Sequence, residues 1–234
     1  MRSILLLPGL ACDAALWREQ VPALAAGNTV QVSDVHSRFA SLPAMAAALL
    51  AEHPGEQVLV GSSMGGMLAL EAWRQAPARV QGLALLGSSA RADTPELLRL
   101  RSDAITLFEQ GRVDEVLRAN VPLALYPRAE RHAALVADYL VMIRRAGALQ
   151  LIAQNRAVMA RVDMRPLLPT LRCPLLVAAG ADDLLTPPEH AREIAKLVPG
   201  ARLESIERCG HLLTWEQPQQ VNTMLLDWLA GLPG

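Results

Sequence analysis

Residues 58–66 read VLVGSSMGG, and this stretch decides the fold that we predict for the chain. Three apolar residues form a short strand pattern, and residues 61–65 then fit the pattern G-x-S-x-G just before a helical pattern opens. In such a pattern a strand turns tightly into a helix, and the serine is held in a strained conformation with its hydroxyl exposed. We therefore predict that Ser63 is a nucleophile at the end of a buried strand.

Other short apolar runs recur through the chain and alternate with helical patterns. The runs are residues 4–7, 28–32, 58–60, 80–86, 175–179 and 202–206. Unbroken apolar runs of this length are typical of a parallel sheet that is covered on both faces. The run at 202–206 is half polar, which indicates an edge strand. We predict an α/β fold with a doubly wound, mostly parallel sheet of about six strands.

The helical patterns divide into two groups. Those between the strands cover residues 14–26, 42–52, 64–75, 189–197 and 218–232. A second group, at 95–109, 113–119, 128–146 and 148–160, fills an interval without a convincing strand. We therefore predict a core of residues 1–89 and 172–234 and an inserted helical cap of residues 90–171.

A serine hydroxyl is a weak nucleophile and needs an adjacent base with an orienting carboxylate. His211 directly follows the last strand pattern, in the kind of loop where a parallel sheet presents a catalytic group. His36 also follows a strand and is the rival base. Asp182 and Asp183 together end the strand at 175–179. We expect one of the two acids to face the histidine, and we assign ordinary turn chemistry to Asp182.

A carbonyl attacked by serine develops a negative oxygen, and backbone N–H groups are the expected donors to it. One donor should be the N–H of Met64, directly after the nucleophile. The other should be the N–H of Leu10, in the loop after the first strand, where Gly9 permits a sharp turn.

These motifs together resemble the α/β-hydrolase superfamily over nearly the whole chain. The resemblance rests on Leu7-Pro8-Gly9, on residues 61–66, on Gly180-Ala181-Asp182-Asp183 with Pro187, and on Gly210-His211 followed by Glu216-Gln217-Pro218. The last group looks like the family's G-H-x4-E-x-P signature, and the family's G-x-x-D pattern makes Asp183 the acid. Many members have His-Gly where this chain has Pro8-Gly9. The chain looks most similar to capped esterases and enol-lactone hydrolases.

The resemblance implies a serine hydrolase that cleaves a small or medium carboxylic ester, thioester or lactone through an acyl-enzyme on Ser63. No metal or organic cofactor is expected. The same three residues also serve acyltransferases and carbon–carbon bond hydrolases, and a non-catalytic ligand receptor can keep this fold. The sequence leaves these alternatives open, together with the physiological substrate and the oligomeric state.

Composition narrows the expected partners. The formal net charge is -1, so the chain lacks the basic surface that nucleic acid requires. No apolar run approaches the roughly 18 to 20 residues that a membrane span needs. The three cysteines, Cys12, Cys173 and Cys209, fit neither a disulfide framework nor a metal motif. We expect a cytoplasmic protein whose partner is a small-molecule substrate.

Overall fold

The computed structural model describes residues 1–129 and 131–233. Its single sheet has six parallel strands in the order β2-β1-β3-β4-β5-β6. The strands are β1 (Ser3–Leu7), β2 (Thr29–Val32), β3 (Gln57–Ser62), β4 (Val80–Leu86), β5 (Leu175–Gly180) and β6 (Arg202–Ile206). The predicted fold class is confirmed, and the half-polar strand at 202–206 does lie at an edge of the sheet.

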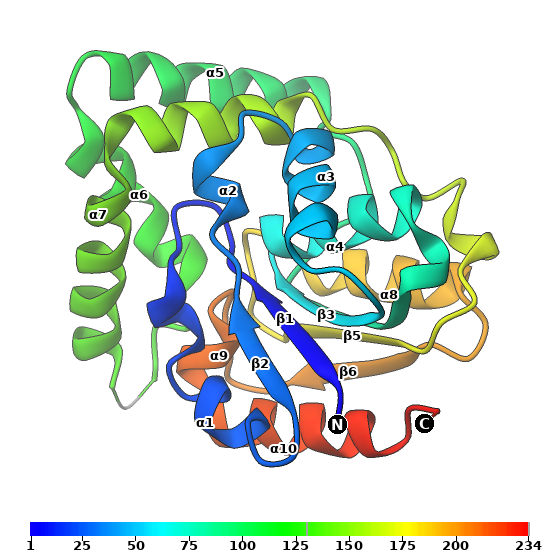
Figure 1. Cartoon of the computed structure of the whole chain (residues 1–234). Helices are drawn as coiled ribbons and strands as arrows, with labels where there is room; N and C mark the ends of the chain where they lie inside the picture. The colour runs from blue at the N-terminus through cyan, green and yellow to red at the C-terminus, as the bar shows by residue number, and fades with distance from the viewer. Residues whose placement is uncertain (130, 234) are drawn as a thin grey trace.

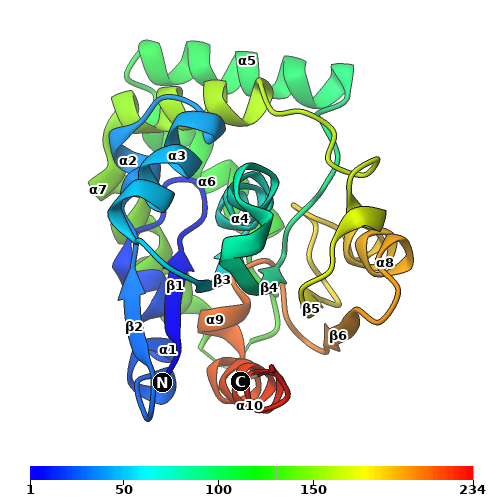
Figure 2. The same cartoon turned by 45° about the vertical axis from the view of Figure 1, so that its right-hand side comes forward.

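Helices cover both faces of this sheet. They are α1 (Gln20–Leu24), α2 (Val35–Arg38), α3 (Leu42–Glu52), α4 (Met64–Gln75), α5 (Pro95–Glu109), α6 (Val113–Ala124), α7 (His132–Met159), α8 (Pro188–Leu197), α9 (Leu213–Glu216) and α10 (Pro218–Ala230), with 3-10 turns η1 (Ala14–Trp17), η2 (Pro77–Arg79) and η3 (Leu168–Thr170). Figure 1 and Figure 2 show their arrangement around the strands.

The apolar runs are unbroken because successive side chains enter two different core layers. Ile4 and Leu6 of β1 pack in the layer that contains α10, whereas Leu5 and Leu7 pack in the layer that contains α3, α4 and α8. All four side chains are almost completely buried. A strand covered on both faces needs apolar residues at every position, which is the pattern that the sequence shows.

The region predicted as one helix over 14–26 is divided in the structure. It contains η1 and then α1, which begins only at Gln20. Pro22 explains the division, because proline has no N–H to bond to the carbonyl of residue 18 and its ring would clash there. With the helix starting at Gln20, Pro22 falls within the first turn, where its missing N–H has no consequence.

Between β4 and β5 the chain forms α5, α6 and α7, which lie together beside the sheet (Figure 1). Helix α7 is broken at Gly147, whose φ of 71° and ψ of 167° are accessible to almost no other residue. The break falls between the helices predicted at 128–146 and 148–160. In the second piece, Ala157 and Val158 pack in the same core layer as α3 and α4. The division into core and cap at residues 90 and 171 stays a prediction.

Within the part of the chain that the structure describes, no helix combines the length and apolar character needed to cross a membrane.

Candidate active site

Ser63 occupies the sharp turn between β3 and α4. Its φ of 53° and ψ of -117° lie in a region that non-glycine residues avoid, and such strain typically costs about 1–3 kcal/mol. Besides the N–H groups of Gly66 and Met67, which donate to its carbonyl, two contacts from β4 and the loop after it hold the residue there. Its N–H donates to the Leu86 carbonyl at the end of β4 (2.9 Å), and its carbonyl accepts from the Ser88 hydroxyl (2.8 Å). Ser63 is partly exposed although Ser62 and Met64 on either side are buried.

Glycines permit this turn because the backbones around it nearly touch. A Cβ at Gly65 would overlap the carbonyl oxygen of Leu7 at the end of β1. A Cβ at Gly61 would overlap the backbone of Gly65, and one at Gly66 would press on the Ser88 side chain. The G-x-S-x-G spacing is therefore a packing requirement of the strand–helix crossing.

Asp183 and His211 are joined by a hydrogen bond of 2.8 Å between Asp183 Oδ2 and His211 Nδ1. Both side chains are buried, with that of Asp183 0% and that of His211 8% exposed. The other oxygen, Asp183 Oδ1, accepts from the backbone N–H groups of Leu185 (2.9 Å) and Thr186 (2.8 Å). A carboxylate can only accept a hydrogen bond, so His211 Nδ1 is the donor and carries the proton. His211 Nε2 is then left as an acceptor.

The environment of His211 has two opposed effects on its pKa. Burial alone would lower the pKa, because it disfavours the charged imidazolium. The negative charge of Asp183 and its hydrogen bond, with a smaller contribution from Glu216, outweigh burial and raise the pKa above its ordinary value. The imidazole is thus stabilised in the charged form that a general base reaches when it removes a proton.

Gly87 connects the serine to this pair. It directly follows Leu86, which holds the Ser63 N–H, and an added Cβ at Gly87 would lie 3.3 Å from both Asp183 Oδ2 and His211 Nδ1. The three residues predicted from sequence, which follow β3, β5 and β6, are therefore gathered around Gly87 at the end of β4. Among the described residues there is no hydrogen bond between Ser63 Oγ and His211 Nε2, a contact that often tightens only when substrate is bound.

The two predicted oxyanion donors flank Ser63. Gly9 packs directly against the serine, since a Cβ at Gly9 would lie 3.3 Å from Ser63 Cβ. The Leu10 N–H follows it in the turn after β1, and the Met64 N–H opens α4. Within the described ranges neither N–H donates to another group. Unpaired donors at a helix start and a tight turn are suited to a negatively charged oxygen.

Glu216 has a role that its place in the sequence signature did not reveal. Its carboxylate accepts three backbone N–H groups, from Gly210 (3.0 Å), Leu212 (3.1 Å) and Tyr126 (2.8 Å). Two of these donors flank His211, and the third lies in the connection between α6 and α7. Burial raises the pKa of Glu216, and the three N–H groups act in the opposite direction. Glu216 therefore fixes the histidine loop against the helical interval.

The other candidate side chains have structural contacts. His36, the rival base, is buried and bonds through Nε2 to the Cys12 carbonyl (2.8 Å). Asp182 is exposed, and its assignment to turn chemistry stays a prediction. Burial raises the pKa of the Cys12 thiol to about 12, so this thiol is not a nucleophile near neutral pH. The described residues contain no cluster of three or more His, Cys, Asp or Glu side chains placed to hold a metal ion.

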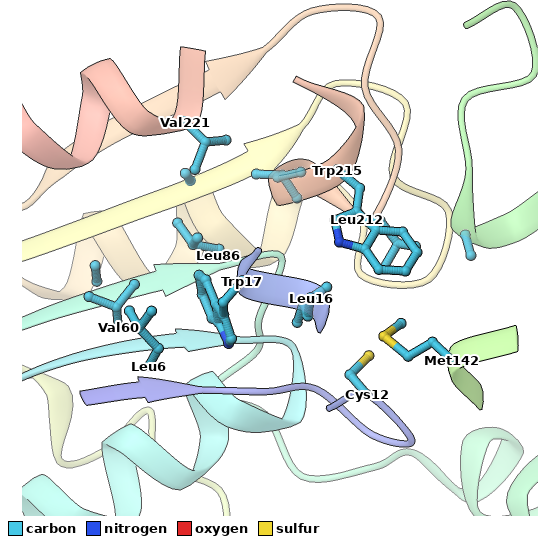
Figure 3. Close-up of a cluster of buried hydrophobic side chains, with 14 of the residues drawn as sticks. Leu6, Cys12, Leu16, Trp17, Val60, Leu86, Met142, Leu212, Trp215 and Val221 are labelled. Carbon is cyan, nitrogen blue, oxygen red and sulfur yellow. The ribbon is translucent and has the colours of Figure 1, made fainter. Parts of the chain in front are cut away.

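Both tryptophans near the site are packing residues. Trp17 is fully buried, and its side chain packs on the sheet near Leu6 and Val60, as Figure 3 shows. The Trp215 side chain is 3% exposed, and its indole N–H donates to the Ala15 carbonyl at 2.9 Å. Both belong to the core layer that also contains Leu212, next to His211.

Comparison with known proteins gives matches along most of the chain. The family model described as alpha/beta hydrolase fold matches residues 2–218. The chain is 28% identical to the pimeloyl acyl-carrier-protein methyl ester esterase of Aromatoleum aromaticum, over 97% of this chain and 98% of that protein.

Solved structures show the same likeness. A thermophilic esterase from Thermogutta terrifontis superposes with a TM-score of 0.89 at 28% identity, covering 98% of this chain and 90% of that one. The enol-lactonase from Burkholderia xenovorans superposes with a TM-score of 0.88 at 21% identity, covering 98% and 92%. At 21% identity the likeness concerns the fold alone.

Proposed function

The chain belongs to the α/β-hydrolase fold family, and from this premise we propose that it is a serine hydrolase acting on small or medium carboxylic esters, thioesters or lactones. The observation that carries the proposal is the buried Asp183–His211 pair beside Ser63 on its strained turn. Esterase activity is named for a relative that matches nearly the whole chain, which supports the same chemistry here.

The proposed reaction has two steps that use the same groups. Ser63 Oγ bonds to the carbonyl carbon while its proton passes to His211 Nε2, and the carbonyl oxygen becomes negatively charged. The N–H groups of Met64 and Leu10 stabilise this oxygen. The bond to the leaving group then breaks, and the leaving group takes the proton from His211. Water attacks the resulting acyl-enzyme in the same way and releases the acid and free Ser63.

The core layer that contains Leu212, next to His211, is apolar, and we infer that the substrate carries an apolar acyl or alkyl group. Phe108, Leu117 and Met142 of α5, α6 and α7 share one core layer with Leu212 and Trp215. Three arginines of this region are engaged in surface ion pairs, Arg144 with Asp114, Arg145 with Asp13 and Arg156 with Glu109. These pairs leave an uncharged substrate as the better fit.

The test compares the wild type with Ser63→Ala and the matched control Ser62→Ala, which removes the neighbouring hydroxyl. We expect the wild type and the control to hydrolyse p-nitrophenyl esters and to be labelled by a fluorophosphonate at residue 63, and Ser63→Ala to do neither. Equal rates in wild type and Ser63→Ala would remove Ser63 as the nucleophile. Ligand binding without turnover or labelling would favour a receptor instead.

A further inference from the structure

The turn after β1 contains a strained residue directly after Leu10. Ala11 has a φ of 61°, in the left-handed region that alanine rarely adopts. Two contacts lie within the turn: the Cys12 N–H donates to the Gly9 carbonyl at 3.1 Å, and the Cys12 thiol lies 3.5 Å from the Leu10 carbonyl oxygen. Neither contact explains why Ala11 keeps an unfavourable conformation. Contacts from outside the turn must therefore hold it.

The main outside contact comes from Gln154, in the second piece of α7. The residue is 1% exposed, and its side-chain Oε1 accepts from the Ala11 N–H at 2.7 Å. Its Nε2 donates to the His36 carbonyl at 2.9 Å. The amide can satisfy both groups in only one orientation, because an N–H needs an acceptor and a carbonyl needs a donor. Gln154 therefore fixes Ala11 relative to α2.

His36 completes the enclosure of the turn. Its Nε2 lies 2.8 Å from the Cys12 carbonyl, which can only accept, so Nε2 is the donor. Burial lowers the pKa of His36, which keeps the ring neutral in this arrangement. Gln154 bonds to Ala11 and to His36, and His36 bonds to Cys12. The two residues after Leu10 are thus tied to two helices that lie far apart in the sequence.

The opposite end of the turn is fixed by packing. Gly9 lies against the Ser63 side chain and the Ser62 carbonyl, each 3.3 Å from an added Cβ. Leu10 therefore lies between Gly9, which packs against Ser63, and Ala11, which bonds to Gln154. The Ala11 N–H belongs to the peptide that joins Leu10 to Ala11, so a shift of this peptide moves Leu10 and with it the peptide that carries the Leu10 N–H.

We propose that Gln154 is a positioning residue of the active site: it holds residues 9–12 so that the Leu10 N–H faces the oxyanion formed on the carbonyl attacked by Ser63. The inference rests on the proposed serine hydrolase function and adds to it a residue from the helical interval. Gln154 touches neither substrate nor nucleophile, and it acts through the backbone of Ala11.

Three variants of the full chain separate positioning from general packing. Gln154→Met keeps the length of the side chain and removes both hydrogen-bonding groups. Gln154→Glu keeps an oxygen for the Ala11 N–H and, when protonated, a donor for the His36 carbonyl. Gln150→Met is the matched control, because Gln150 lies one helical turn earlier beside the same turn of residues 9–12. Thermal unfolding confirms that each variant is folded.

The readouts are kcat and KM for p-nitrophenyl butyrate and the inhibition constant of an alkyl trifluoromethyl ketone. This ketone adds Ser63 Oγ to its carbonyl and forms a stable tetrahedral oxyanion, so its affinity reports on the donors. We expect Gln154→Met to lower kcat about 10- to 100-fold, with KM changed less than about threefold. The ketone should bind weaker by a similar factor, because both effects come from the oxyanion. Gln154→Glu should recover most of kcat, and Gln150→Met should behave as the wild type.

The outcomes are distinguishable. If the wild type is neither active nor labelled at Ser63 by a fluorophosphonate, the proposed function fails and this inference fails with it. If the wild type is active and folded Gln154→Met matches it, only the inference on Gln154 is overturned. Loss of kcat without weaker ketone binding, or a Gln154→Glu variant as slow as Gln154→Met, would also overturn it. If Gln154→Met does not fold, Gln154→Asn replaces it, and the same loss is expected because the shorter amide cannot reach both partners.

Discussion

Replacing Asp183 with asparagine should lower kcat/KM by about four orders of magnitude without unfolding the protein. The carboxylate accepts three N–H groups, two at Oδ1 from Leu185 and Thr186 and one at Oδ2 from His211. Asparagine offers one oxygen and one NH2 group. The two backbone donors will keep the oxygen, because turning the amide round would leave both facing NH2, at about 1–3 kcal/mol each.

The NH2 group of the substituted side chain would then face His211 Nδ1, and two donors cannot share a bond. The imidazole would respond by moving its proton to Nε2, the nitrogen that has to accept the proton of Ser63. A fall of about 10⁴ corresponds to about 5.5 kcal/mol of lost transition-state stabilisation. The pKa of His211 should fall as well, since the Asp183 charge raises it in the wild type.

The assay is kcat/KM for p-nitrophenyl butyrate from pH 6 to pH 9, with urea unfolding as the test of folding. Asp182→Asn is the matched control, because it makes the same change at the exposed neighbouring residue and should leave the rate unaltered. A folded Asp183→Asn enzyme with kcat/KM within tenfold of the wild type would refute the tautomer argument.

Three further predictions follow from the site. Glu216→Gln leaves one oxygen for three backbone N–H groups, so kcat/KM should fall about tenfold. The acid limb of the pH profile of kcat/KM should also move to lower pH, because the Glu216 charge raises the pKa of His211. An unmoved limb would contradict this role of the charge, and Glu207→Gln, at an exposed residue, is the control. Gly65→Ala forces a methyl group onto the Leu7 carbonyl and should lower the free energy of unfolding in urea by more than about 4 kcal/mol. Gly55→Ala, in open space, should lower it by only about 1 kcal/mol. Similar losses in the two variants would show that the strand–helix crossing can relax around the methyl group. In the wild type, kcat/KM should fall with decreasing pH as His211 gains a proton. The midpoint of this fall should lie above about pH 6.5, because the pKa of His211 is raised. A midpoint below that value would count against His211 as the base.

The sheet was predictable from sequence because burial on both faces leaves unbroken apolar runs. The strand at 80–86, for example, has the predicted bounds in the structure. The short helices α2 and α9 were not predicted, since a helix of four residues has no periodicity to detect. The helix over 14–26 was wrong as one element because tertiary packing and Pro22 divide it.

The residues at the site differ in how visible they are in the sequence. Ser63, Asp183 and His211 each follow a strand at a recognisable motif, so their approximate positions follow from the sheet topology. Gln154 has no motif, and in the sequence it resembles Gln150 one turn before. Its partner Ala11 is 143 positions away, and only the folded chain reveals which glutamine is buried against it. The assignment of these residues to catalysis stays a prediction.

The break at Gly147 divides α7 into two helices that belong to different parts of the structure. The helix before it, residues 132–146, contributes Met142 to the core layer that contains Leu212, whereas the helix after it carries Gln154 and is anchored in the core through Ala157 and Val158. A designer exchanging the region above the site for that of another enzyme should therefore cut at Gly147 rather than at residue 171. A graft ending at 147 replaces α5, α6 and the first piece of α7, and it keeps Gln154 with its bonds to Ala11 and His36 in place.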